Sequence, residues 1–301
     1  MMMSYAHEQK TKIRVRLREK EVKKEPHVNT TNINYLLQKA EFELEKLIGV
    51  ENVKAMVREI YAWVHINRCR EKHQLKTEAH SMHMIFKGNP GTGKTTAARL
   101  VGRLLKDLGY LSKGHFIEAE RADLVGEYIG QTAQKTRELL QKAHGGVLFI
   151  DEAYALNRGG EKDFGKEAVD TLVKAMDEGN HSFILILAGY SKEMEQFITL
   201  NPGLPSRFPI QLDFPDFSMD QMMMIAENML QSRDYVWTID AKEKLKKKLD
   251  DQKLRAREPF SNGRAIRNAI EKAIRSHAVR IVKEQTEKDI DALKTLKERD
   301  F

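Results

Sequence analysis

The sequence predicts an α/β fold, in which a parallel sheet is flanked by helices, followed by a smaller domain made only of helices. Between about residues 82 and 214, short apolar runs alternate with segments whose apolar residues recur at helical spacing. This pattern is typical of strands joined by helical crossovers. After Phe214-Pro215, apolar residues recur only at helical spacing. We therefore expect a basic, partly flexible arm at 1–43, an α/β domain at 44–214 and a helical domain at 215–301.

The composition is that of a globular protein. Hydrophobic residues make up 41% and charged residues 32% of the 301 positions, as expected for a helix-rich chain with a substantial core. No run approaches the roughly 20 apolar residues of a membrane-spanning helix, and residues 1–10 lack the apolar centre of a signal peptide. Cys69 is the only cysteine, which excludes an internal disulfide and suits a reducing compartment. We expect a cytoplasmic protein without a membrane span.

The N-terminal arm carries the strongest local charge. Residues 8–25 hold eight Lys/Arg and four Glu, in a chain whose net charge is +7. A duplex-binding surface concentrates its basic residues on a folded face, so this distribution argues against nucleic acid as a partner. Residues 12–18 alternate basic and apolar side chains, which predicts one short strand. This segment is either a basic edge strand or disordered arm, or it binds a lipid head group, a neighbouring subunit or nucleic acid.

Helical segments precede the predicted sheet, and five apolar runs form it. One helical segment ends at the turn at Gly49, and the next carries apolar residues from Val53 to Val64 at helical spacing. The expected strands are 84–86, 115–117, 147–150, 183–187 and 210–212. In the second domain, we expect helix faces at 222–229 and 266–281.

A complete phosphate-binding loop follows the first expected strand. It is the motif Gly88-Asn89-Pro90-Gly91-Thr92-Gly93-Lys94-Thr95, continued by Thr96 in a predicted helix. The glycines let backbone N–H groups converge on phosphate oxygens, and the helix directs the positive end of its dipole at the same anion. Lys94 supplies a positive charge to the β- and γ-phosphates, and the Thr95 hydroxyl binds Mg²⁺. The sequence therefore predicts a site for ATP with Mg²⁺.

Two acids follow the third expected strand. Residues 147–150 form an uninterrupted apolar run that ends in Asp151 and Glu152, as in a parallel strand buried on both faces. Asp151 would hold Mg²⁺, and Glu152 would orient and polarise the attacking water. An ordinary acidic loop is the alternative, and the phosphate loop upstream disfavours it. The second carboxylate favours hydrolysis over a passive nucleotide switch.

Over residues 45–283 the sequence resembles the AAA+ ATPases, in the branch of the Rubisco activase CbbX and of CfxQ. The phosphate loop and the segments 47–50, 146–154 and 187–190 carry this resemblance. The longer segments 118–130 and 158–165 are similar to the stage V sporulation protein K family of spore-forming bacilli. The resemblance implies a hexameric ring with ATP bound between neighbouring subunits, and a role in sporulation.

The resemblance also implies two arginine roles. Arg207 stands where these proteins place the arginine finger, which reaches the γ-phosphate bound by the next subunit. The alternative is an arginine that caps a strand or pairs with a surface acid. Arg264, in Ser261-Asn262-Gly263-Arg264, would sense the γ-phosphate from the helical domain. Arg267 is the second candidate, and a solvated helix start is the alternative.

Two further positions rest on the resemblance alone. Ile48 and Gly49 would line the adenine pocket. The family usually places Asn, Thr or Ser after the fourth strand as a nucleotide sensor, whereas this chain has Gly189-Tyr190-Ser191. The sensor is therefore either Tyr190 or Ser191.

A Gly-flanked loop carries Tyr128, Ile129 and Gly130. AAA+ protein translocases place an aromatic–apolar pair here, facing a central pore where it grips polypeptide. An aromatic side chain gives a large contact area at a small cost in rotamer entropy. The alternative is that Tyr128 packs against its own domain. The polar, Gly-rich segment 157–165 is either a second pore loop or a mobile connection.

These predictions describe a ring-forming ATPase, a homo-oligomer that uses ATP and Mg²⁺ to remodel a protein client. Two alternatives share the same nucleotide chemistry: a nucleic-acid-dependent ATPase or translocase, and an ATP-binding assembly switch with little turnover. A built-in protease is disfavoured, because the sequence has no His-Glu-x-x-His motif and too few residues beyond 283 for a protease domain.

Overall fold

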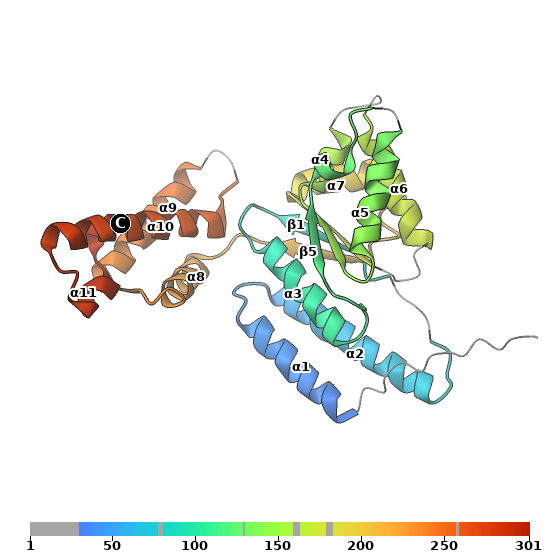
Figure 1. Ribbon diagram of the computed structural model, residues 1–301, viewed down its shortest axis with the longest axis horizontal. Helices are drawn as coiled ribbons and strands as arrows, with labels where there is room; N and C mark the ends of the chain where they lie inside the picture. The colour runs from blue at the N-terminus through green and yellow to red at the C-terminus, as the bar shows by residue number, and fades with distance from the viewer. Residues whose placement is uncertain (1–29, 78–80, 129, 159–162, 179–182, 257–258) are drawn as a thin grey trace, which may run out of the picture.

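The computed structural model describes residues 30–77, 81–128, 130–158, 163–178, 183–256 and 259–301. They form an α/β domain and a helical domain, joined by a linker near residue 215 (Figure 1). The strand predicted at 12–18 and the pore-loop residue Ile129 lie outside the described residues, so both stay predictions. No helix in the described part of the chain combines the length and apolar character needed to cross a membrane.

The α/β domain is built on a parallel sheet of five strands, which confirms the predicted fold class. In spatial order the strands are β2 (Phe116–Ala119), β3 (Val147–Ile150), β4 (Ile184–Gly189), β1 (Met84–Gly88) and β5 (Ile210–Phe214). Gly88 stands opposite Phe214, and Lys87 stands opposite Gly189. Because all the pairings are parallel, the strands end at one edge. That carboxyl edge gathers the phosphate loop, the acidic pair and the segment after β4.

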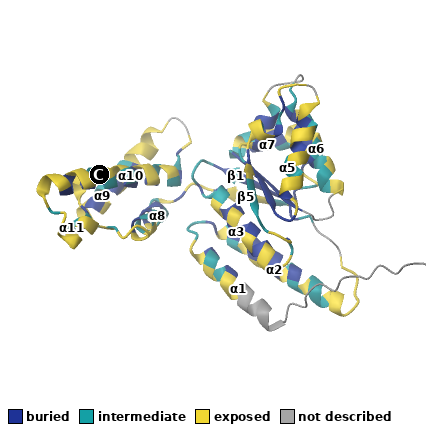
Figure 2. Ribbon diagram, in the orientation of Figure 1, coloured by how far each residue is buried: buried dark blue, intermediate teal, exposed yellow. Residues whose placement is uncertain are grey.

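Helices cover both faces of the sheet. One face packs against α1 (Thr30–Glu45), α2 (Glu51–Lys72) and α3 (Lys94–Asp107). The other packs against α5 (Gln131–Ala143), α6 (Gly165–Glu178) and α7 (Ser191–Leu200), with the short helices α4 (Arg121–Leu124) and η1 (Ala153–Asn157). Neighbouring strand residues point to opposite faces, so Phe86 lies in the first core and Ile85 in the second. Burial on both faces explains why the central strands β3 and β4 are continuous apolar runs (Figure 2), whereas the edge strands β2 and β5 carry exposed polar residues.

The predicted boundary between arm and α/β domain, at 43/44, falls inside α1. Ala40 and Leu44 are both buried in the core that α1 shares with α2 and α3. An amphipathic helix gains most of its stability from such packing. The packed part of the chain therefore begins before residue 44.

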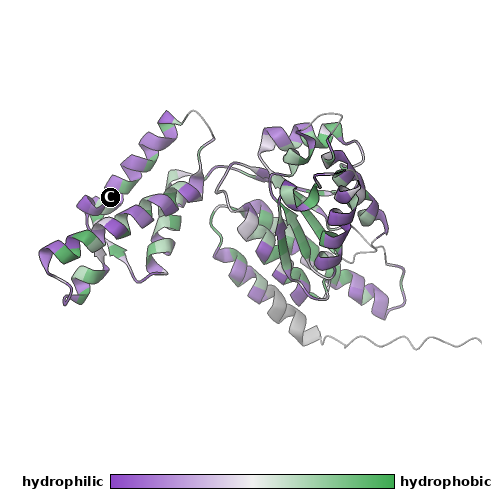
Figure 3. Cartoon of the chain, turned by 45° about the horizontal axis from the view of Figure 1, so that its top comes forward, coloured by the Kyte–Doolittle hydropathy of each residue, from purple (hydrophilic) through white to green (hydrophobic). Residues whose placement is uncertain are grey.

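The helical domain packs around its own apolar core, which includes Met222, Leu245 and Ile270. Its helices are α8 (Met219–Gln231), α9 (Ile239–Arg255), α10 (Asn262–Glu284) and α11 (Ile290–Lys294). Ser218 begins α8 with a capping box, in which its hydroxyl accepts from the Gln221 backbone N–H. In Figure 3 the sheet is almost wholly hydrophobic, whereas the helices carry hydrophilic and hydrophobic residues on different faces.

One element of the helical domain differs from the prediction of helices alone. Two short strands, β6 (Val236–Trp237) and β7 (Thr295–Leu296), pair in parallel, and the 3-10 helix η3 (Glu298–Asp300) follows. Two-residue strands are too short to show a period in the sequence. The buried Arg280 of α10 fixes this segment, because its Nε and Nη2 donate to the carboxylate of Asp300 at 2.8 and 3.0 Å.

Candidate active site

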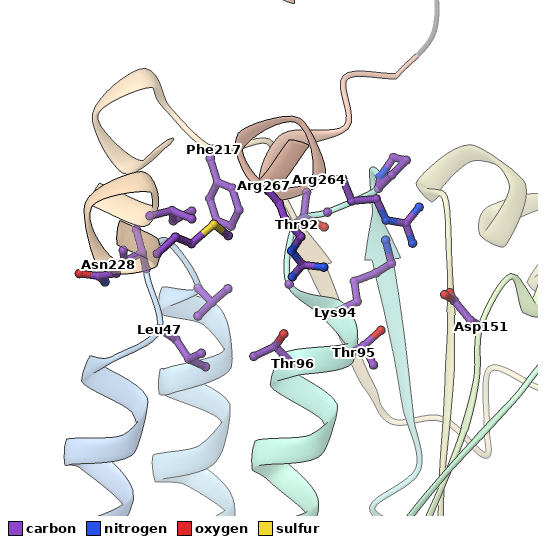
Figure 4. A pocket seen from close by; sticks show the side chains of 18 of the residues that line it. Leu47, Thr92, Lys94, Thr95, Thr96, Asp151, Phe217, Asn228, Arg264 and Arg267 are labelled. Carbon is purple, nitrogen blue, oxygen red and sulfur yellow. The ribbon is translucent and has the colours of Figure 1, made fainter. Parts of the chain in front are cut away.

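A cavity of about 490 Å³ lies between the carboxyl edge of the sheet and the helical domain. The phosphate loop from Pro90 to Thr96 lines it, as do the acidic pair after β3 and residues of α8 and α10. Figure 4 shows Lys94, Thr95 and Asp151 toward one end of the cavity and Leu47, Phe217 and Asn228 toward the other. The predicted phosphate-binding and acidic residues are therefore brought together, with an apolar pocket beside them.

The phosphate loop has the backbone shape that its glycines permit. Gly93 has a φ of +94° and directly precedes α3, whose first residue is Lys94. The first N–H groups of a helix have no partner within the helix, and the helix dipole favours an anion there. The Thr92 hydroxyl donates to the Asn89 carbonyl at 2.8 Å and closes the loop from inside. The loop thus presents donors to the cavity and suits a phosphate group.

Lys94 is held beneath the loop. Its Nζ donates to the carbonyls of Gly88 and Asn89 at 2.7 and 2.9 Å. Burial lowers the pKa of Lys94 to about 8, while the charge of Asp151 opposes the shift and that of Arg264 adds to it. At neutral pH the group therefore stays mainly charged, and it is preoriented toward the phosphate loop.

The acidic pair follows β3 in an unusual backbone conformation. Glu152 has a φ of +47°, in the left-handed region that non-glycine residues rarely adopt. The Asp151 Oδ1 accepts from the Glu152 backbone N–H at 3.0 Å, and Arg158 Nη2 lies 3.7 Å from Glu152 Oε2. Such strain often marks functional sites. Here both acids line the cavity.

The donors at this end of the cavity fit Mg²⁺. Thr95 and Asp151 both line it and offer a hydroxyl and a carboxylate, the hard oxygen ligands that Mg²⁺ prefers. Within the described residues, no group of three or more His, Cys, Asp or Glu side chains could hold a metal by itself. Mg²⁺ commonly keeps water ligands and takes the rest from substrate phosphates. Thr95 and Asp151 are therefore the residues that would hold it.

The helical domain reaches the phosphate loop through the start of α10. The Gly263 N–H donates to the Gly91 carbonyl at 3.0 Å. A Cβ added to Gly91 would lie only 2.3 Å from the Ser261 carbonyl oxygen, so only glycine fits. Both sensor candidates, Arg264 and Arg267, line the cavity. The structure therefore places both arginines beside the phosphate loop.

A hydrogen-bond network around Asn262 at this contact was not predicted from the sequence. The fully buried Asn262 donates to Asp216 Oδ1 at 2.7 Å and accepts from the Phe217 backbone N–H at 3.0 Å. Asn89, in the phosphate loop, donates to the same Asp216 oxygen at 2.9 Å. Asp216 thus links the loop, the linker and α10.

Of the positions predicted for the adenine pocket and the nucleotide sensor, some line the cavity and others do not. Ile48 lines the cavity, with Leu47 and Val50 beside it. Gly49 is not among the lining residues and packs against α8, since a Cβ there would lie 2.8 Å from Gln221 Nε2. Tyr190 lines the cavity and Ser191 does not, which favours Tyr190 as the residue that faces the nucleotide. Apolar lining residues of α8 were missed because their spacing also fits a helix core.

Arg207 lies away from this cavity, in the turn before β5. Its Nε and Nη2 donate to the Asp177 carboxylate at 2.9 and 2.6 Å, and its Nη1 donates to the Gly203 carbonyl at 2.8 Å. Because β5 runs parallel to β1, Arg207 stands near the amino edge of the sheet, opposite the phosphate loop.

The loop before α5 exposes its aromatic side chain. Tyr128 is 67% exposed, so the alternative that it packs against its own domain is wrong. Gly130 has a φ of +85° and begins α5. Nearby, Arg121 of α4 donates to the Asp163 carboxylate and to the Ala155 carbonyl, at 2.9 and 2.7 Å for its Nη1. This pair ties the helix before the Tyr128 loop to the second predicted pore-loop segment.

Comparisons with known proteins agree with this architecture. Residues 84–216 match the ATPase family associated with various cellular activities (AAA), and residues 218–301 match the AAA lid domain. The stage V sporulation protein K of Bacillus subtilis is 58% identical over 248 residues, which cover 82% of this chain and 77% of that protein. The chloroplastic ribulose bisphosphate carboxylase/oxygenase activase of Cyanidioschyzon merolae is 44% identical over 238 residues, with coverage of 78% and 80%.

A solved structure supports the fold. The FIGL-1 AAA domain in complex with ADP superposes with a TM-score of 0.57 at 20% identity, over 84% of this chain and 80% of that one. At this identity the likeness shows the fold alone. Together with the sequence relatives and with a cavity built from the phosphate loop, the acidic pair and the lid, these findings show that the chain belongs to the AAA+ family of ATPases.

Proposed function

We propose that this ATPase works as a ring of identical subunits, a hexamer, which uses ATP hydrolysis to remodel a protein client during sporulation. The position of Arg207 is the observation that supports assembly of several subunits. Gly88 stands opposite Phe214, seven residues after Arg207. At the rise of an extended chain this separation is roughly 20 Å, far beyond the reach of an arginine side chain. Arg207 can therefore serve a γ-phosphate only in another copy of the chain.

Within one subunit, the residues of the cavity divide the work of hydrolysis. The N–H groups at the start of α3 and the charge of Lys94 bind the β- and γ-phosphates. Glu152 orients and polarises the attacking water, and Arg264 senses the γ-phosphate from the lid. Mg²⁺, held by Thr95 and Asp151, supplies positive charge against the phosphate oxygens when it is bound. Arg207 of a neighbour stabilises the charge that develops on the transferred phosphoryl group.

The protein client is supported by an exposed side chain and by a relative. Tyr128 stands out from its domain between a flanking glycine and α5, where it can contact another polypeptide. The activase relative is named for its action on another protein, ribulose bisphosphate carboxylase/oxygenase. The relative from Bacillus subtilis is named for sporulation, which supports the proposed cellular role.

The first test measures ATP turnover against protein concentration, together with light-scattering mass in ATP, for wild type, Glu152→Gln and Arg207→Ala. Wild-type specific activity should rise with assembly. Glu152→Gln should bind ATP and assemble without turnover, whereas Arg207→Ala should bind ATP and lose about 10³-fold in turnover. If specific activity is independent of concentration and Arg207→Ala hydrolyses normally, the shared-site ring is wrong.

The second test addresses the client with an unfolded polypeptide, casein, as the probe. Casein should stimulate wild-type turnover, and Tyr128→Ala should lose this stimulation while its basal turnover stays unchanged. Tyr128→Phe, which keeps the ring, is the matched control and should retain most of the stimulation. Equal stimulation of all three proteins would exclude Tyr128 as the client contact. Stimulation by DNA or RNA instead would favour a nucleic-acid-dependent ATPase.

A further inference from the structure

We propose that Asp177 positions Arg207 as the arginine that completes the ATP site of a neighbouring copy. The inference rests on the proposed ring, and it assigns a role to a carboxylate at the end of α6 that sequence reasoning did not single out. Asp177 lies 30 positions before Arg207 in the chain. It acts through Arg207 and does not itself approach the nucleotide.

The contact between the two side chains is bidentate. Asp177 Oδ1 accepts from Arg207 Nε at 2.9 Å, and Asp177 Oδ2 accepts from Nη2 at 2.6 Å. The Gly203 carbonyl accepts from Nη1 at 2.8 Å. Gly203 stands four residues before Arg207, in the turn that precedes β5. The plane and the direction of the guanidinium are thereby both fixed.

The hydrogen bonds leave a defined set of donors for a ligand. A guanidinium carries five N–H groups in one plane, and these contacts use one on each of its three nitrogens. One N–H on each Nη remains. That of Nη2 points away from Asp177, because the contact with Asp177 uses the Nη2 hydrogen beside Nε. Such N–H groups match the oxygens of a phosphate.

The pair is placed on an accessible surface. The Arg207 side chain is 29% exposed and the Asp177 side chain is 53% exposed. The hydrogen bond with Arg207 lowers the pKa of Asp177, so the carboxylate stays charged across the physiological range. An ion pair this exposed adds little to folding stability. Its effect is instead to fix the arginine before the reaction, which lowers the entropy lost on reaching the transition state.

A competing hypothesis is that Asp177 restrains Arg207 and inhibits turnover. An inhibitory carboxylate would occupy the edge that a phosphate needs. Asp177 binds the edge formed by Nε and Nη2 and does not occupy the edge formed by Nη1 and Nη2. The geometry therefore favours positioning. The two hypotheses predict opposite signs for the effect of removing the carboxylate.

The test begins with Asp177→Asn in the full chain. We expect kcat for ATP hydrolysis to fall by about tenfold, with KM for ATP, ring mass and thermal midpoint unchanged, because the arginine is less well fixed in the transition state. The matched control is Glu178→Gln, which alters the next residue of α6, an ion-pair partner of Lys174. This control should keep wild-type kcat. An unchanged or raised kcat in Asp177→Asn overturns the proposal.

Mixed rings provide a readout that a structural defect would not give. Asp177→Asn subunits have intact nucleotide sites and weakened fingers, whereas Glu152→Gln subunits have inactive sites and intact fingers. In a 1:1 mixture, about a quarter of the head-to-tail interfaces pair an intact site with an intact finger. Turnover should therefore exceed the average of the two separate proteins. Suppose that Arg207→Ala gains activity when mixed with Glu152→Gln but Asp177→Asn does not. The proposed role of Asp177 would then be wrong, while the shared ATP site would stand.

Failure of the ring itself gives a different pattern. If neither Arg207→Ala nor Asp177→Asn gains activity with Glu152→Gln, and Arg207→Ala alone hydrolyses normally, then the shared site is wrong and the role of Asp177 fails with it. Asp177→Glu serves as the conservative variant, since it keeps a carboxylate. It should retain more of the wild-type kcat than Asp177→Asn, and a lower kcat would contradict a positioning role for the charge.

Discussion

The two edges of the parallel sheet are built in contrasting ways. At the carboxyl edge, the phosphate loop, the acidic pair, α8 and α10 of a single chain enclose a cavity of about 490 Å³. At the amino edge, Arg207 is held by Asp177 and by its own turn, and its side chain is 29% exposed. The first edge is suited to bind a ligand by itself, and the second is suited to complete a site elsewhere. Under the proposed function, one chain is sufficient to bind the nucleotide, whereas hydrolysis requires residues from two neighbouring chains.

The largest expected effect is on ATP binding, which we expect to depend on the carboxyl edge and not on the amino edge. Lys94→Ala removes the buried cation beneath the phosphate loop, and we expect ATP affinity to fall by at least about 100-fold, because charge-assisted contacts to phosphate are lost. Binding of a fluorescent ATP analogue measures this. Lys87→Ala is the control, since Lys87 lies on the same strand–loop unit and faces Asp213 at 3.5 Å. If Arg207→Ala weakens ATP binding by the same factor, then the proposed division between the edges is incorrect.

A smaller effect concerns pH and the carboxyl edge alone. Burial lowers the pKa of Lys94 to about 8, so in the free protein the amine is charged below pH 8 and becomes neutral above it. Binding ATP above pH 8 must then be accompanied by proton uptake, and affinity should fall by up to about tenfold per pH unit. Calorimetric titration in buffers of different ionisation enthalpy measures the number of protons taken up when ATP binds. An affinity that stays constant from pH 7 to 9.5 would contradict this account.

The smallest predicted effect lies where the two domains meet. Asn262→Ala removes the hydrogen bonds that α10 makes to Asp216 and to the Phe217 backbone. We expect ATP affinity to fall about threefold to tenfold, because Asp216 loses the hydrogen-bond partner that links the phosphate loop to α10. The change should also weaken the protection of the lid by ATP against limited proteolysis. Wild-type affinity together with wild-type protection would show that the network does not couple loop and lid.

The sequence predicted the carboxyl edge well, because its chemistry is local. Lys94, Thr95, Asp151 and Glu152 stand in two short motifs, and each motif follows a strand whose burial on both faces leaves an uninterrupted apolar run. The parallel sheet then brings both motifs to one edge. Motif and fold support each other, so those residues could be named before the structure was known.

The connections between distant segments could not be predicted in the same way. Asn89 and Asp216 are 127 positions apart, and Asn262 is a further 46 away. Neither Asp216 nor Asp177 stands in a recognisable motif, and a single surface or linker carboxylate has no periodic signal. Gly49 was predicted to line the adenine pocket because its segment resembles the family. It packs against α8 instead, and that contact depends on how the lid packs, which the local sequence does not show.

The close contact between Gly91 and the start of α10 also sets the point about which the lid would rotate. The lid touches the phosphate loop at one end of a helix of 23 residues, which is about 35 Å long at the usual rise. A rotation of about 10° at that end would therefore carry the other end through about 6 Å. In Figure 1, α10 extends away from the α/β domain toward α11. A rotation of the lid about this contact would thus produce its largest displacement at the far end of α10, near α11.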